Sequence, residues 1–152
     1  MSLLATIRPD AWNFPLLLHV LGAMLMVGAL VLAASALIVA WRDGNAALVR
    51  TGFRSLLMGA LPAWVLMRAG AAWIADKEHL TDSKASWIGI GSATADGGLL
   101  VLVLATVLGW LAVRRGARAA GPSGFSRFSA GLASALIIGY GIAIGAMTTK
   151  PT

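Results

Sequence analysis

Residues 14–41 read FPLLLHVLGAMLMVGALVLAASALIVAW, a stretch without Asp, Glu, Lys or Arg. This stretch is long enough to cross a bilayer as a helix, because a span needs about 20 apolar residues. Three further apolar blocks follow along the chain, at 53–75, 87–113 and 128–148. The sequence therefore predicts an all-α fold, a four-helix transmembrane bundle that forms a single integral membrane domain over residues 1–152.

The composition supports a membrane protein and excludes several other classes. The 152 residues are 59% hydrophobic and 12% charged, with a mean hydropathy of +0.83, a more apolar balance than soluble domains have. The net charge is +6, but the arginines stand at the ends of apolar blocks, so we expect no nucleic-acid partner. Because cysteine is absent, disulfides, thiolate catalysis and iron–sulfur clusters are excluded. No Ser-His-Asp order, HExxH motif or phosphate loop is present, which argues against a hydrolytic enzyme.

The distribution of positive charge predicts the orientation, because short loops rich in Lys and Arg stay in the cytoplasm. The second connection, at about 76–84, is net acidic. Seven arginines lie in the first and third connections or at their borders: Arg42, Arg50, Arg54, Arg114, Arg115, Arg118 and Arg127. We therefore expect both termini and the second connection on the outer side, with the first and third connections in the cytoplasm.

Small residues indicate where the helices pack, since apolar side chains gain little by leaving lipid for one another. The last span contains a GxxxG pair, Gly141 and Gly145. This pair suits contact within the bundle, or contact with a second copy or a partner membrane subunit, and both alternatives stay open. In the second span, Pro62 lacks a backbone N–H and is expected to kink the helix.

Polar side chains inside the spans carry the question of function. His19, Arg68 and Asp96 are ionisable, and Tyr140 adds a weaker polar group in the last span. Because a charge in hydrocarbon is costly, each needs a partner or a function. Counted from the inner arginines at about 1.5 Å per residue, Arg68 and Tyr140 lie at about 20 Å, Asp96 at about 27 Å and His19 at about 34 Å. We expect them to line a cup that opens to the outside, above an inner half with no ionisable group.

Two readings of this polar group follow. In the functional reading, Arg68 binds the anionic group of a lipid head group, a small anion or a partner subunit, and Asp96 orients the guanidinium. This predicts a binding, accessory or transport-associated membrane protein rather than a hydrolytic enzyme. In the structural reading, Arg68 and Asp96 only neutralise each other, His19 is solvated at the boundary, and Tyr140 packs in the core with its hydroxyl on a backbone carbonyl.

A second functional hypothesis adds the outer connection. If the second helix continues past residue 75, His79 lies about 37 Å from the inner boundary, at the height of His19. Asp76 and His79 are three residues apart, a spacing at which a carboxylate and an imidazole can share a metal or orient each other. Two imidazoles at one height also suit the axial ligands of haem b. A redox protein that binds haem b or copper through His19, His79 and Asp76 is therefore the alternative function.

The segment 15–30, PLLLHVLGAMLMVGAL, resembles the first helix of small bacterial membrane proteins related to the copper-resistance protein D type, in which an LHxxGA segment recurs. The resemblance covers this one helix. It implies a helical bundle in the bacterial plasma membrane and, by analogy, a haem or copper role for His19. The chain departs from the pattern in having no second histidine within a spanning segment.

Overall fold

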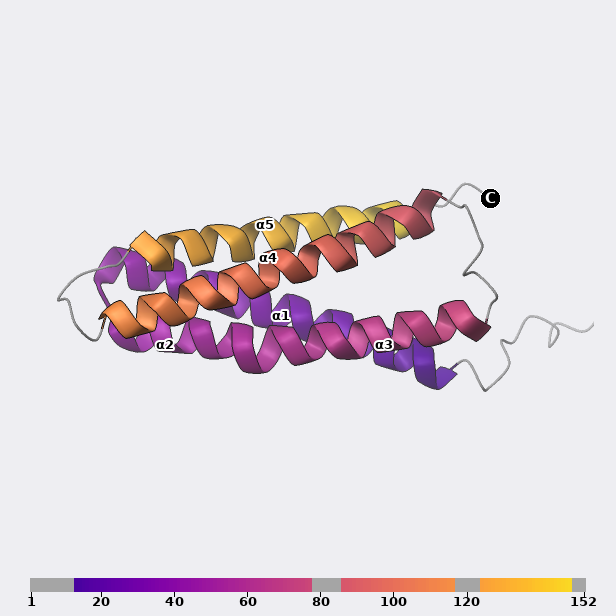
Figure 1. Ribbon diagram of the computed structural model, residues 1–152, viewed down its shortest axis with the longest axis horizontal. Coiled ribbons are helices and arrows are strands. Elements are labelled where there is room, and N and C mark those ends of the chain that lie inside the picture. The colour runs from indigo at the N-terminus through magenta and orange to yellow at the C-terminus, as the bar shows by residue number, and fades with distance from the viewer. Residues whose placement is uncertain (1–12, 78–85, 117–123, 149–152) are drawn as a thin grey trace, which may run out of the picture.

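The computed structural model describes residues 13–77, 86–116 and 124–148, and all of these residues are helical except for a short turn between the first two helices. The elements are α1 (Asn13–Asp43), α2 (Ala46–Arg54), the π-helical η3 (Ser55–Ala60), α3 (Leu61–Lys77), α4 (Ser86–Gly116) and α5 (Gly124–Thr148). They run as long rods side by side (Figure 1). The predicted all-helical fold is confirmed.

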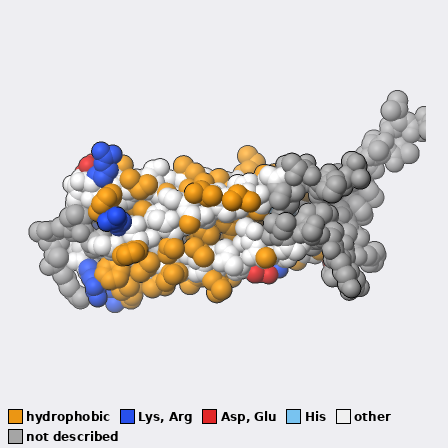
Figure 2. All heavy atoms as spheres, turned by 90° about the horizontal axis from the view of Figure 1, so that it is seen from above, with side chains coloured by type: hydrophobic (Ala, Val, Ile, Leu, Met, Phe, Trp, Pro, Cys, Tyr) orange, Lys and Arg blue, Asp and Glu red, His pale blue; other side chains and the backbone are white. Residues whose placement is uncertain are grey.

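Four of the helical segments are long and apolar enough to cross a membrane, as predicted. Three of them are α1, α4 and α5, and the other is the unbroken run of α2, η3 and α3 over Ala46–Lys77. Large apolar side chains, such as Met24, Leu100 and Ile138, are exposed along the bundle, and apolar side chains cover much of the face seen in Figure 2. In water such a surface would be unfavourable, but in lipid it is the expected one. These are the features of a multi-pass membrane protein whose outer surface contacts the bilayer.

The second helix begins earlier than the predicted residue 53. Gly44 turns the chain with a positive φ of 67°, and the side chain of Asn45 then caps α2. Its Oδ1 accepts hydrogen bonds from the backbone N–H groups of Ala47, at 2.9 Å, and Leu48, at 3.4 Å. This cap satisfies N–H groups that no helical carbonyl reaches. The helix therefore starts at Ala46, immediately after the turn.

The irregularity expected at Pro62 takes the form of a π-helical turn. Segment η3 ends just before Pro62, and the backbone N–H of Leu61 bonds to the carbonyl of Leu56, five residues earlier. A proline has no N–H to donate and its ring crowds the carbonyl four residues before it. The wider π turn re-pairs the neighbouring backbone groups without leaving the membrane-spanning segment.

Two glycines allow α1 and α3 to pack backbone against backbone. A Cβ added at Gly70 would lie 2.5 Å from the backbone nitrogen of His19 and 2.7 Å from the carbonyl of Pro15. A Cβ at Gly22 would overlap the backbone of Met67 in the same way. Such close approach through small residues is typical of helices in membranes. The contact holds His19 against α3.

The helices are not packed equally on all sides. Helix α1 contacts α3 and α5 extensively, and α4 contacts α5 and α2, whereas α3 and α4 make few contacts. In Figure 1, α4 approaches the chain at α2 and diverges from α3 toward the opposite end of the bundle. Away from α2, the bundle thus has a loosely packed seam between α3 and α4.

Arginines and aromatic rings meet at the end of the bundle opposite this seam. The guanidinium of Arg114 lies 3.9 Å from the centre of the Trp110 ring, and that of Arg127 lies 4.9 Å from the Trp41 ring. Figure 2 shows most of the visible basic side chains gathered at one end of the molecule. Arginines stacked on interfacial aromatic rings anchor a helix end at the membrane surface.

The GxxxG pair of α5 has open space beside it among the described residues. Gly141 and Gly145 are exposed, and a Cβ added at either would meet no neighbouring atom within 4 Å. The described residues therefore give no support for close packing of this pair within the bundle. The helix contacts of α5 use other residues, including the buried Ala130, Ala133 and Ala143.

Candidate functional site

Arg68 on α3 and Asp96 on α4 form an ion pair across the seam between these helices. The guanidinium Nε donates to Oδ1 of Asp96 at 3.1 Å, and Nη2 donates to Oδ2 at 3.3 Å. Both carboxylate oxygens are engaged, so the pair has the two-pronged geometry that fixes the plane of a guanidinium. The sequence reasoning considered this pairing, and the structure brings the two residues together.

The pair faces outward. The side chain of Arg68 is 36% exposed and that of Asp96 is 59% exposed. Such exposure would be unremarkable on a soluble protein, but within a membrane span it places two charges at the surface of the bundle. Counted along the helices from the arginines at the far end of the bundle, they lie about 20–27 Å into a hydrocarbon layer of about 30 Å, which is close to one boundary of that layer. The guanidinium and the carboxylate are accessible from outside the bundle rather than enclosed in it.

A second polar contact crosses the same seam one helical turn away. The indole Nε1 of Trp64 donates to the backbone carbonyl of Ala95 at 3.0 Å. Trp64 is four residues before Arg68, and Ala95 precedes Asp96. The two bridges therefore lie next to each other and join helices that otherwise barely touch. Sequence reasoning missed this role of Trp64, although an indole in mid-span signals an N–H that needs an acceptor.

His19 is held on the opposite side of α3. Its Nδ1 lies 2.9 Å from the backbone carbonyl of Met67, the residue before Arg68, and the side chain is half-buried. Because a carbonyl only accepts hydrogen bonds, Nδ1 must carry the proton, and in the neutral ring Nε2 is then the unprotonated nitrogen. His19 and Asp96 thus contact one turn of α3 from two different helices.

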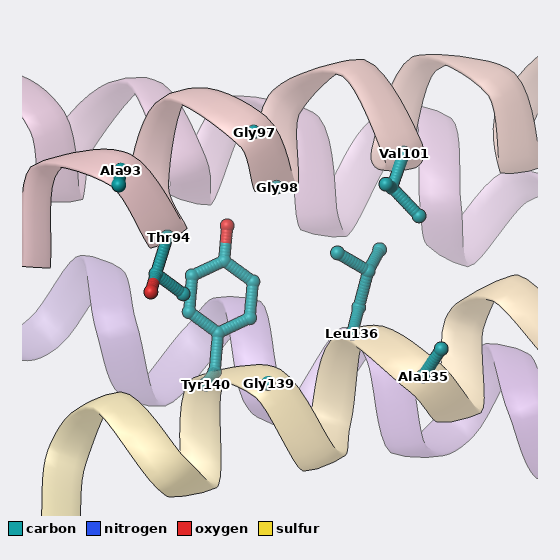
Figure 3. Close-up of a pocket in the computed structure, with 9 residues that line it drawn as sticks. All are labelled: Ala93, Thr94, Gly97, Gly98, Val101, Ala135, Leu136, Gly139 and Tyr140. Carbon is teal, nitrogen blue, oxygen red and sulfur yellow. The ribbon is translucent and has the colours of Figure 1, made fainter. Parts of the chain in front are cut away.

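Tyr140 lies between α4 and α5, away from the ion pair. Its ring is buried, with 6% of the residue exposed, and Figure 3 shows it pointing from α5 toward Gly98 on α4. The hydroxyl is buried and has no hydrogen-bond partner in the described part of the chain. The expectation that it bonds to a backbone carbonyl is therefore wrong. The ring packs as predicted, and its hydroxyl lies beside the side chain of Trp64.

The four predicted side chains are spread over the half of the bundle away from the arginine-rich end. Tyr140 lines a groove between α4 and α5 that none of the other three lines. Arg68 and Asp96 face outward from the seam between α3 and α4, and His19 contacts α3 from α1. The structure thus brings together Arg68 and Asp96. His19, on α1, contacts the backbone of Met67, the residue before Arg68.

Of the three candidate metal ligands, His19 and Asp76 lie within the described residues. Asp76 is exposed in the last turn of α3, and His79 lies outside the described residues. Within 13–77, 86–116 and 124–148, no three His, Cys, Asp or Glu side chains cluster in a way that could hold a metal ion.

In the arginine-rich half of the bundle, three hydroxyl groups each donate to one backbone carbonyl. Ser129 on α5 donates to the carbonyl of Ala105 on α4 at 2.8 Å, and Ser55 donates to the carbonyl of Ala29 on α1 at 2.7 Å. Thr106 donates to Leu102 within its own helix at 2.8 Å. The hydroxyls of Ser129 and Ser55 thus tie helices together, as polar groups in membranes commonly do. They belong to the packing of the bundle and not to a polar path through it.

Comparison with protein-family models, with curated proteins and with solved structures gives no match to this chain.

Proposed function

We propose that this protein is a binding or accessory component of the bacterial plasma membrane, with a polar site on its outer side. The site is the exposed Arg68–Asp96 pair on the seam between α3 and α4, and its ligand is an anionic group, a phosphate or a carboxylate. In this proposal both termini and the connection between α3 and α4 face outward, as the distribution of arginines predicts.

The observation that carries this proposal is the exposure of a two-pronged ion pair near the outer boundary of a membrane span. Ionisable side chains within spans usually face a bundle interior or a water-filled cavity, because their transfer into lipid is costly. A charged pair on an outer surface is therefore expected to meet water, a head group or a polar partner there.

The chemistry of the pair suits an anion. A guanidinium has five N–H donors, and Asp96 accepts from Nε and Nη2 only. The remaining donors can reach the oxygens of a phosphate or carboxylate while Asp96 keeps the guanidinium plane fixed. Arg68 is thus the binding residue, and Asp96 is a positioning residue.

Lipid retention measured by native mass spectrometry tests this assignment. We expect the protein to retain phosphatidylglycerol in preference to phosphatidylcholine, and Arg68→Gln to reduce that preference by about tenfold, the loss of one charge-assisted contact. Arg50→Gln is the matched control, because Arg50 is an exposed arginine bonded only to its own helix. Competition by inorganic phosphate would identify a free anion as the ligand. Equal behaviour of the two variants would contradict the proposal.

Association with a second copy or with a partner membrane subunit belongs to the same proposal. A Cβ added at Gly141 or Gly145 would meet no atom of the described residues within 4 Å, and small residues of this kind allow close helix contact. An Ile142→Cys variant on this face is expected to form a cross-linked dimer in membranes. Failure to cross-link would contradict the proposal that this face of α5 contacts a second copy of the protein.

The alternative function, a redox protein that binds haem b or copper, is favoured by one observation. The bond from Nδ1 of His19 to the Met67 carbonyl is the arrangement by which a backbone group orients a metal-binding imidazole and leaves Nε2 for the metal. The absorption spectrum and metal content of the purified protein test this alternative. A Soret band or bound copper that is lost in His19→Ala would support it, and a colourless, metal-free protein would refute it.

A further inference from the structure

The arginine-rich end of the bundle carries positive charge that the described residues do not balance. It is formed by the end of α1, by α2, by the end of α4 and by the start of α5. Within the described residues of this end, Asp43 is the one acid, and no ion pair engages an arginine there. Six exposed arginines belong to it: Arg42, Arg50, Arg54, Arg114, Arg115 and Arg127. The surface is therefore suited to a partner that brings negative charge.

Two of these guanidiniums are held in place by an aromatic ring of a neighbouring helix. That of Arg115 on α4 lies 4.5 Å from the centre of the Phe125 ring on α5, and that of Arg127 on α5 lies 4.9 Å from the Trp41 ring on α1. A guanidinium over a ring uses its face, and its N–H groups point outward in its own plane. Stacking therefore fixes each cation and leaves its hydrogen-bond donors available.

Both held cations lie beside the first turn of α5. Phe125 and Arg127 belong to that turn, and α5 packs against both α1 and α4. Arg115 therefore lies on the seam between α4 and α5, and Arg127 lies on the seam between α1 and α5. Within the described residues, no hydrogen bond engages either guanidinium. The surface thus presents two separate cations with free donors on adjacent seams.

The aromatic rings indicate the depth of this surface in the membrane. Trp41 and Trp110 are 40% and 39% exposed, and half-exposed tryptophans settle at the level of the lipid head groups. A guanidinium beside such a ring lies at the level of the lipid phosphates, to which arginine can donate two parallel hydrogen bonds. Lipid phosphates already lie at this level, whereas an acidic protein would have to displace them.

We propose that the two seams beside the first turn of α5 bind one phospholipid that carries two phosphodiester groups, one on Arg115 and one on Arg127. Basic pockets between membrane helices suit such head groups. Once the first phosphate is bound, the second is held close to its own arginine, so binding of the second is favoured. This surface is separate from the Arg68–Asp96 pair and does not depend on the function proposed for that pair.

Native mass spectrometry from mixed micelles tests this surface with two lipids. Diphosphatidylglycerol carries two phosphates and phosphatidylglycerol carries one. At equal phosphate content, the protein is expected to retain the first three- to tenfold better, and Arg115→Gln or Arg127→Gln is expected to abolish this preference. Arg50→Gln is the matched control, since it removes the same charge from the same end, but Arg50 is bonded to the Ala46 carbonyl of its own helix. It should leave the preference unchanged.

A second arm removes a ring and keeps every charge. Trp41→Leu frees the guanidinium of Arg127 and is expected to lower the preference for diphosphatidylglycerol at least threefold, and Trp41→Phe, which keeps a ring, is expected to restore it. Trp73→Leu is the control. Trp73 is 43% exposed and contacts the ring of Phe14 toward the other end of the bundle, so its loss should not affect the preference.

Three results would overturn the proposal. Equal losses in Arg50→Gln and Arg127→Gln would show that diffuse charge attracts lipid without a site. Equal retention of the two lipids by the unmodified protein would show that the two phosphates are not bound together. Retention of polyglutamate without a preference between the lipids would assign the surface to an acidic protein. Arg68→Gln is expected to leave the ratio of the two lipids unchanged, so this proposal and that for the Arg68–Asp96 pair can fail separately.

Discussion

Arg68 and Asp96 illustrate how one contact can be both a structural tie and a site. They connect two helices that otherwise touch little, yet their side chains are exposed. Each charge is tolerable within the span because the other neutralises it. A neutral pair at the surface of the bundle retains spare N–H donors, and these donors make Arg68 available to a ligand.

A double-mutant cycle at this pair measures its structural part. Replacing one partner, in Arg68→Leu or Asp96→Leu, leaves an unpaired charge, and we expect a loss of about 1–3 kcal/mol in the free energy of unfolding. The value is lower than for a fully buried pair because both side chains are partly exposed. The double variant is expected to be more stable than either single variant. Reversible unfolding in mixed micelles checks this, and additive losses would show that the pair does not couple the two helices.

At the scale of single residues, the sequence shows which side chains are polar but not which groups they contact in the folded bundle. The charges of Arg68 and Asp96 were visible because charge within a span is rare. The acceptor of Trp64 is a backbone carbonyl of another helix, which leaves no trace in the sequence. The missing acceptor of Tyr140 was equally hidden, because it depends on how α4 and α5 pack.

At the scale of the elements, the contact between α1 and α3 sets the position of His19. Gly22 and Gly70 let the two backbones meet, and the bond between His19 and the Met67 carbonyl follows from that approach. If the helices were spaced by larger side chains, the imidazole would not reach the carbonyl.

Gly70→Ala tests this close contact. The added methyl would lie within 3 Å of the α1 backbone, which cannot shift as a flexible side chain can. We expect a loss of about 2 kcal/mol or more in the free energy of unfolding, as for other overpacked sites. Gly28→Ala on α1 is the matched control, since its added methyl meets no atom within 4 Å and alanine favours a helix. Similar unfolding of the two variants would contradict the packing described here.

The elements themselves were largely predictable from the sequence. Each apolar block became a helix, because a chain in lipid must satisfy its backbone groups internally. The boundaries were less certain, since capping by Asn45 extended the second helix toward the turn. Pro62 signalled an irregularity, but its form as a π turn depends on which carbonyls the neighbouring N–H groups reach.

For the whole molecule, the expectation that His19, Arg68, Asp96 and Tyr140 line one cup came only from their depth along the helices. Counting residues along each helix gives a height, and the heights of the polar groups agreed well enough to suggest one shared interior. Counting residues does not give the direction in which a side chain points around the helix axis. The packing of α4 directs Asp96 to one seam, and the groove that Tyr140 lines lies along another.

Cysteine labelling in intact cells tests the central claim, an outward-facing site in which Arg68 attracts anions. The natural chain has no cysteine, so Asp96→Cys can be labelled alone. We expect membrane-impermeant methanethiosulfonates to label it from outside, and the anionic sulfonate reagent to react several-fold faster than the cationic ammonium reagent, a preference that Arg68→Gln removes. Asp43→Cys, at the predicted cytoplasmic end of α1, should stay unlabelled. If Asp96→Cys is not labelled from outside, or is labelled equally by both reagents, the site does not face outward or does not favour anions.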